Sequence, residues 1–108
     1  MTYEPKERQI LDEVTAVLHK HYRERLSRVV LFGSRARREH QPDSDYDILV
    51  VLHGELDARA ERKSLTGLMI PIDLANDAVI FCHAVPEKRF IAEKSALMMN
   101  VRAEGVLL

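Results

Sequence analysis

Two aspartates, Asp45 and Asp47, stand one residue apart directly before an apolar run, Ile48 to Leu52. Side chains alternate between the two faces of a β-strand, so both carboxylates are expected to project from the same side of a sheet. Ionised carboxylates at that spacing repel each other, and a fold tolerates the repulsion best when a cation lies between them. The pair is therefore the first candidate for a metal site.

A third acid, Asp73, interrupts the apolar run from Ile70 to Ala75, which is predicted to be a strand with Pro71 at its start. Taken alone, Asp73 is more simply an acid at the end of a strand. If that strand lies beside the strand of Asp45 and Asp47, however, the three acids converge. Oxygen ligands without nearby His or Cys favour a hard cation such as Mg²⁺, and two such ions can activate an attacking oxygen for displacement at phosphorus.

The turn Gly33-Ser34 supplies a complementary group for phosphate. Gly33 would let a phosphate approach the backbone closely, and Ser34 would offer a hydroxyl beside it. If a helix begins at Arg35, its free N–H groups point to the same place, and Arg35 and Arg37 add positive charge. We therefore expect Gly33, Ser34, Arg35 and Arg37 to bind a polyphosphate, with Arg38 facing water.

Two strands and a short helix must position these groups. An apolar, β-branched segment from Arg28 to Phe32 is predicted to be a buried strand, and a second strand is predicted from Asp45 to His53. Between them, a short helix over residues 35–40 should stop before Pro42. The second strand is apolar on both faces beyond Asp47, which is typical of a central strand.

Three longer helices are predicted around this pair of strands. Residues 5–26 carry an apolar stripe at helical spacing, with Glu7 among the charged residues on the other faces. Residues 56–69 form a second helix and residues 87–103 a last one, which Gly105 should end. Residues 77–85 fit either a short helix or a strand. The residues expected to face inward from the last helix are Phe90, Ile91, Ala96, Leu97, Met98 and Val101.

Composition and length limit the possibilities. The chain has 108 residues, 46 % of them hydrophobic, which predicts one domain over residues 1–108 with a modest core. Its order of elements indicates an α/β or α+β fold in which helices pack on a small mixed β-sheet. A formal charge of −1 gives no general attraction to nucleic acid or membrane, and a single cysteine gives no sign of secretion. We expect a cytoplasmic protein that binds neither membrane nor nucleic acid directly.

The motif as a whole resembles that of a known superfamily. Gly33-Ser34, ten residues and then Asp45-Tyr46-Asp47 is similar to the signature of the nucleotidyltransferases related to DNA polymerase beta. The longer string, with Pro42-Asp43-Ser44 before the acids and Ile-Leu-Val after them, resembles the small branch called minimal nucleotidyltransferases. One departure is Arg38, where the family often has glycine.

This resemblance implies the nucleotidyltransferase fold and a set of roles. Asp45 and Asp47 would bind Mg²⁺, and Asp73 would be the third acid, on metal or on the attacking hydroxyl. Gly33 and Ser34 would hold the triphosphate of ATP. The family transfers a nucleoside monophosphate, usually AMP, to a hydroxyl and releases pyrophosphate.

The resemblance also implies a partner. Many minimal nucleotidyltransferases are antitoxins of HEPN-type ribonuclease toxins, which they silence by adenylylating a tyrosine. The chain is accordingly expected to be a Mg²⁺-dependent protein adenylyltransferase in a hetero-oligomer. Two alternatives stay open: an antitoxin that acts by direct binding through the last helix and the tail Val106–Leu108, or a nucleotide-binding domain of an oligomer that transfers nothing.

Other reactive side chains are assigned to packing. Tyr46 lies between the two acids in sequence but should face the opposite side of its strand. Cys82 is expected to be a small buried hydrophobe. His53 and His83 have no metal-ligand spacing with other residues and are interpreted as structural.

Overall fold

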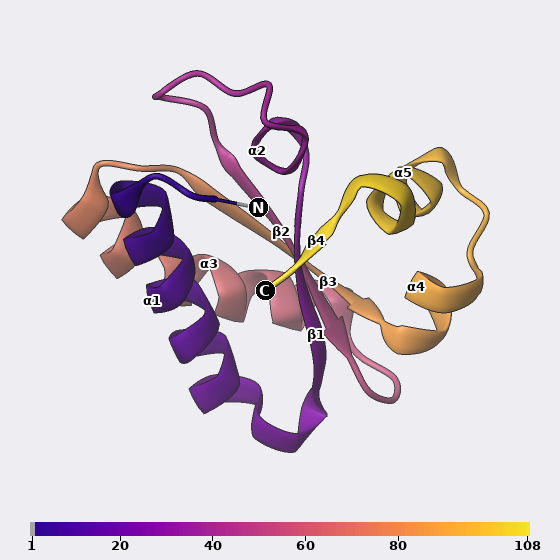
Figure 1. The fold of residues 1–108 in the computed structure, drawn as a ribbon. Helices are drawn as coiled ribbons and strands as arrows, with labels where there is room; N and C mark the ends of the chain where they lie inside the picture. The colour runs from indigo at the N-terminus through magenta and orange to yellow at the C-terminus, as the bar shows by residue number, and fades with distance from the viewer. Residues whose placement is uncertain (1) are drawn as a thin grey trace.

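A four-stranded mixed sheet forms the centre of the computed structural model, which describes residues 2–108 (Figure 1). Its strand order is β3-β2-β1-β4; β2 runs antiparallel to β1 and parallel to β3, and β4 runs antiparallel to β1. The strand that carries Asp47 is central, as predicted. The strands are β1 (Leu26–Phe32), β2 (Tyr46–Leu52), β3 (Ile80–Pro86) and β4 (Val106–Leu107).

Helices cover both faces of the sheet, which confirms the α/β fold. In Figure 1, α1 and α3 lie on one side of the strands, α4 and α5 lie on the other, and α2 stands at one end. A 3₁₀ turn, η1, joins α1 to β1, so the first helix ends earlier than predicted. The helices are α1 (Pro5–Tyr22), α2 (Ser34–Arg37), α3 (Ala58–Asn76), α4 (Glu87–Ala92) and α5 (Ala96–Glu104), and η1 is Arg23–Arg25.

Alternating side chains of β2 divide the core into two layers. Ile48, Val50 and Leu52 pack with α1 and α3 in the larger cluster. Leu49 and Val51 face the other way and pack with Val30, Val85 and the inner sides of α4 and α5. Since the strand period is two, Asp47 belongs to the face of Leu49 and Val51.

The predicted strand over residues 70–75 is wrong, because α3 continues to Asn76. The segment is apolar enough to resemble a strand, but its buried positions Leu65, Met69, Ile72 and Asn76 follow helical spacing. Ile70 and Leu74, which a buried strand would have covered, are 49 % and 80 % exposed. Pro71 lies inside the helix, where it leaves one backbone carbonyl without its usual partner.

The C-terminal third also differs from the prediction in part. The segment left open as helix or strand is β3, and the single last helix is two helices broken around Ser95, whose hydroxyl accepts a hydrogen bond from Met98 N at 3.2 Å. Met98 is buried as expected. Ile91 and Leu97, predicted to face inward, are 57 % and 47 % exposed. Ala96 is also exposed, whereas Phe90 and Val101 face inward as predicted.

The apolar tail is part of the sheet. Gly105 ends α5 as predicted, and Val106 and Leu107 then pair with Leu31 and Val30 of β1. Leu107 remains 68 % exposed on this short edge strand.

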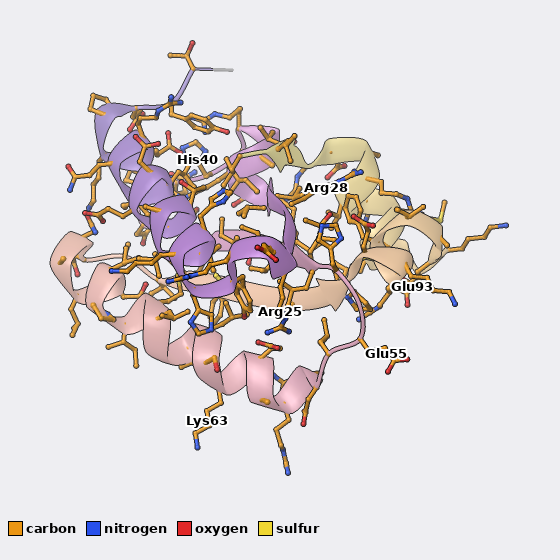
Figure 2. The ribbon with its side chains drawn as sticks, turned by 90° about the horizontal axis from the view of Figure 1, so that it is seen from below. Arg25, Arg28, His40, Glu55, Lys63 and Glu93 are labelled. Carbon is orange, nitrogen blue, oxygen red and sulfur yellow. The ribbon has the colours of Figure 1, made fainter. Side chains whose placement is uncertain are left out.

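A buried acid ties the end of α1 to α3. Glu61 of α3 accepts hydrogen bonds from the Tyr22 hydroxyl at 3.0 Å and from Arg25 Nη2 at 2.7 Å. Figure 2 shows Arg25 between the chain that follows α1 and the helix α3. Burial and the neighbouring Glu61 carboxylate raise the pKa of Tyr22 above its ordinary value. These bonds attach the end of α1 and the turn η1 to α3 just before the chain enters β1.

No helix within residues 2–108 is both long enough and apolar enough to cross a membrane.

Replacing the helix-interior proline tests the corrected position of residues 70–75. Pro71→Ala restores a backbone N–H inside α3, so we expect the free energy of unfolding to rise by about 1–2 kcal/mol in urea titrations. Pro5→Ala is the control, because Pro5 occupies the first turn of α1, where proline is favourable, and should bring no gain. A loss of stability in Pro71→Ala would contradict the helix.

Candidate active site

The carboxylate of Glu7 is the centre of a buried ion cluster at the start of α1. It accepts hydrogen bonds from Arg35 Nη1 at 2.9 Å, from Arg38 Nη2 at 2.8 Å and from the Glu4 backbone N–H at 3.1 Å. His40 Nε2 lies 3.4 Å away, and Figure 2 shows His40 beside α1. Glu7 is only 2 % exposed, so its predicted place on an outer face of the helix is wrong.

These contacts change the acidity of Glu7. Burial alone would raise its pKa, but the hydrogen bonds from Arg38, the Glu4 backbone and Arg35 outweigh it and lower the pKa to about 2. Glu7 is therefore ionised in the folded protein over the whole neutral range.

Arg35 also connects Glu7 to the loop that precedes the acid pair. Its guanidinium donates to the Ser44 carbonyl at 2.8 Å and to the Pro42 carbonyl at 3.2 Å, and it stacks 3.9 Å above the centre of the Tyr46 ring. Arg35 is 3 % exposed. Its buried position therefore does not support the expectation that it binds phosphate. Instead, Arg35 holds the loop that leads to Asp45. Tyr46 faces the core, as predicted.

The turn at Gly33 fits closely against Asp47. Gly33 has φ of +75°, a conformation that side chains rarely adopt, and a Cβ there would overlap Oδ2 of Asp47. Its carbonyl accepts hydrogen bonds from the N–H groups of Ala36 and Arg37, both at 3.1 Å, which start the single turn of α2. Ser34 follows at the first position of α2 and is half-buried. Only glycine brings the backbone this near to the carboxylate.

Asp45 and Asp47 lie together at the entrance to β2. Asp45 is exposed just before the strand, and Asp47 is half-buried as its second residue. Burial, followed by the charge of Asp45, raises the pKa of Asp47, while His83 and Arg37 partly oppose the shift. Within residues 2–108, neither carboxylate has a salt-bridge partner. Such a pair favours a divalent cation between its oxygens.

Arg37 is the arginine of the turn that faces solvent near this pair. Its side chain is 39 % exposed and contacts Glu39 at 3.1 Å and Glu104 of α5 at 3.5 Å. Exposed ion pairs of this kind are weak and exchange readily. The position of Arg37 is compatible with the predicted contact to phosphate.

Asp73 does not join Asp45 and Asp47. It lies on α3, where its Oδ1 accepts a hydrogen bond from Ile80 N at 3.1 Å at the start of β3. Its charge also contributes to raising the pKa of Cys82, which packs on the α1 and α3 side of the sheet. Asp47 faces the other side. Within the described part of the chain, no three His, Cys, Asp or Glu side chains form a metal-binding group, so the predicted convergence of three acids is wrong.

A histidine that the sequence did not single out lies on the face of Asp47. His83 pairs with Leu49 in the parallel register of β2 and β3, and its ring centre is 6.2 Å from that of Phe32. Its spacing to other residues matches no metal site, which is why it is interpreted as structural from the sequence. The register of β3 against β2, if known from the sequence, would have placed His83 on the face of Asp47.

The remaining assignments are explained by the geometry. Arg38 has φ of +59° and ends α2 in the left-handed conformation, which explains why glycine is common there in the family that the motif resembles. Burial raises the pKa of Cys82 to about 12, as expected for an unreactive thiol. His53 lies 3.6 Å from Glu87, away from the acid pair.

Comparisons of sequence place these features in a family. Residues 11–98 match the model of the nucleotidyltransferase domain. A protein of Methanocaldococcus jannaschii, named "putative protein adenylyltransferase", is 31 % identical over 102 residues, which cover 94 % of this chain and 97 % of that protein.

Comparisons of structure give the same fold. A crystal structure of a "putative nucleotidyltransferase" from Sulfolobus solfataricus superposes with a TM-score of 0.66 at 20 % identity, covering 94 % of this chain and 81 % of that one. A toxin–antitoxin complex with AMP-PNP gives 0.63 at 22 % identity over 89 % and 69 % of the two chains. A Shewanella oneidensis complex of tri-AMPylated HEPN toxin with MNT antitoxin gives 0.55 at 23 % over 92 % and 70 %.

Substitutions at two glycines with the same φ distinguish the cost of backbone strain from the cost of the contact with Asp47. Gly33 and Gly54 both have φ of +75°, but an added Cβ meets no atom within 4 Å at Gly54. Gly54→Ala should therefore cost about 1 kcal/mol of unfolding free energy from strain alone. Gly33→Ala should cost about 3 kcal/mol, because it also displaces a packed carboxylate. Equal losses in denaturant unfolding would show that the turn does not press on Asp47.

Acid unfolding tests the cluster around Glu7. The folded state holds the pKa of Glu7 at about 2, below its ordinary value, so the stabilisation is complete at neutral pH and is lost as the pH falls toward 2. We expect Glu7→Gln to lower the unfolding free energy by about 3 kcal/mol at pH 7, and the difference from the wild type to shrink below about pH 4.5.

Glu39→Gln is the matched control for this variant, since the Glu39 side chain is 67 % exposed in its pair with Arg37. It should change the stability by less than about 0.5 kcal/mol at any pH. A Glu7→Gln deficit that stays constant down to pH 3 would contradict the cluster.

Proposed function

The chain belongs to the nucleotidyltransferase domain family, and we propose that it transfers AMP from ATP to a tyrosine hydroxyl of a HEPN-type toxin. In this role it is a minimal, MntA-like antitoxin that acts with its partner in the cytoplasm. The hydroxyl oxygen forms a bond to the α-phosphorus, the bond from that phosphorus to the pyrophosphate oxygen breaks, and pyrophosphate leaves.

The observation that carries the proposal is the contact between the Gly33 turn and Asp47. The turn offers backbone groups and the Ser34 hydroxyl to a triphosphate, and Asp47 lies directly beside it with Asp45 at the strand entrance. Arg37 adds a solvent-exposed positive charge at the same end of the sheet. A nucleotide bound here has its phosphates between the turn and the acid pair.

The donor set fits Mg²⁺, because Asp45 and Asp47 provide only oxygen ligands and burial with mutual repulsion raises the pKa of Asp47. Mg²⁺ bound to one or two carboxylates completes its coordination with water and substrate phosphates, so two acids are sufficient to hold it. When bound, the ion neutralises phosphate charge during displacement. In this proposal Asp73 is not a metal ligand, and a second Mg²⁺ ion would be held through the nucleotide phosphates.

The acceptor is proposed to come from another protein. Residues 2–108 form one sheet with its covering helices, and the acid pair stands at the end of the sheet next to α2, where Asp45 is exposed. The Methanocaldococcus relative is named for adenylyl transfer to protein, and one structure of the same fold is a complex of AMPylated HEPN toxin with its antitoxin. Both support a protein acceptor and a hetero-oligomer.

An antitoxin that acts by occlusion alone is the second candidate. Large apolar side chains stay exposed on α4, α5 and β4, and a partner could cover them without any transfer. They are Ile91, Leu97, Met99 and Leu107.

Transfer is measured by incubating the protein with Mg²⁺, ATP labelled at the α-phosphorus, and the HEPN protein encoded beside it. We expect label on a tyrosine of the HEPN protein and release of unlabelled pyrophosphate. Asp45→Asn with Asp47→Asn should lower the rate by at least about 1,000-fold, since it removes the ligands of the charge-neutralising ion.

Asp43→Asn is the control, because Asp43 is an exposed acid of the same loop and should leave transfer unchanged. Toxin neutralisation in cells then separates the two candidates. Full neutralisation by the double variant would favour occlusion, and failure of the folded double variant to neutralise would favour transfer.

A further inference from the structure

The register of β3 brings two side chains to the face of the acid pair. Asp47 pairs with Phe81, and Leu49 pairs with His83, in the parallel ladder between β2 and β3. Paired residues of a parallel ladder point to the same side of the sheet, so Phe81 and His83 share the face of Asp47. Of these two side chains, only His83 has atoms that can bind a proton.

The imidazole of His83 lies above the central strand. β1 and β3 flank β2 on its two sides, so their backbones stand roughly 9.5 Å apart. The ring centres of Phe32 on β1 and His83 on β3 are nevertheless only 6.2 Å apart. Both rings therefore lean over β2, where Asp47 is the direct neighbour of Phe32 in the antiparallel ladder.

The nitrogens of the His83 ring have no polar partner among the described residues. The ring is exposed, and within residues 2–108 it forms no hydrogen bond or salt bridge. By contrast, His40 lies 3.4 Å from Glu7 and His53 lies 3.6 Å from Glu87. An imidazole ring has a nitrogen that can accept a hydrogen bond from a hydroxyl group.

We infer that His83 is a catalytic residue that accepts the hydrogen bond of the acceptor hydroxyl beside Asp47. The inference rests on the proposed function and deepens it. As the hydroxyl oxygen forms its bond to the α-phosphorus, its proton passes to the free nitrogen of His83 and then to solvent, while pyrophosphate leaves with the electron pair of the broken P–O bond. His83 thus performs the task expected of Asp73, which α3 holds on the other side of the sheet.

The first test is the transfer assay with Mg²⁺, ATP and the HEPN protein. We expect His83→Ala to lower the maximal rate of transfer at least about 100-fold, as loss of a positioned proton acceptor does. The dissociation constant for AMP-PNP, measured by calorimetry with Mg²⁺, should change less than about two-fold, because the residue contacts the acceptor and not the triphosphate. His53→Ala, at the other end of the sheet, is the control and should change neither quantity.

A rate within about two-fold of the wild type in His83→Ala would overturn the inference. So would a loss of AMP-PNP affinity of about ten-fold or more, since that result would place His83 on the nucleotide. Rescue of His83→Ala by added imidazole, without rescue of the Asp45→Asn and Asp47→Asn variant, would support it.

The second test does not depend on transfer. Imidazole ¹⁵N resonances are recorded by NMR before and after AMP-PNP and Mg²⁺ are added to the protein. We expect the His83 signals to shift and those of His53 to stay, because His83 shares the face of Asp47, whereas His53 follows the opposite end of β2, next to Glu87. If the His83 signals shift but the wild-type protein transfers no label, the proposed acceptor is wrong, whereas the position of His83 at the nucleotide site is supported. Unmoved His83 signals in nucleotide-bound protein would overturn the inference.

Discussion

The ionised side chain of Glu7, buried between Arg35 and Arg38, is the interaction on which the geometry of the site depends. A buried carboxylate is costly unless it is paired and fully hydrogen-bonded, and here two guanidinium groups and a backbone N–H surround it. The same Arg35 that neutralises Glu7 also holds the carbonyls of Pro42 and Ser44. The first helix, the turn after β1 and the loop before β2 are thereby joined through one charge cluster, which sets where Asp45 stands.

The second constraint is that the two faces of the sheet differ: one holds the larger core and the other holds the candidate site. The face covered by α1 and α3 holds the larger core, together with Asp73 and Cys82. The other face is covered by α4 and α5 over Leu49 and Val51, with Phe32 packed against this cluster, while Asp47 is half-buried and His83 is exposed. A single strand therefore contributes to the buried core along most of its length and to the candidate site at its first residues.

Sequence patterns were sufficient wherever a local rule decides the structure. The Gly33-Ser34 turn and the central position of β2 follow from the unusual freedom of glycine and from a strand that is apolar on both faces. The errors arose where tertiary contacts decide. Helical burial of Met69 and Ile72 outweighed the strand-like composition around Pro71, and this moved Asp73 onto a helix. Glu7 is buried by pairing with Arg35, 28 residues away in sequence, and with Arg38, 31 residues away, which no local pattern reveals. The role of His83 depends on the register of β3, which the ambiguous run Val79-Ile80-Phe81 concealed.

The central claim is that the Gly33 turn and the pair Asp45 and Asp47 together bind a nucleoside triphosphate with its metal. The most direct measurement is a crystal structure of the protein with AMP-PNP and Mn²⁺, in which anomalous scattering locates the metal. We expect an anomalous peak between the carboxylates of Asp45 and Asp47, with the triphosphate against Gly33 and Ser34. A metal peak at Asp73, or a nucleotide bound away from the Gly33 turn, would contradict it.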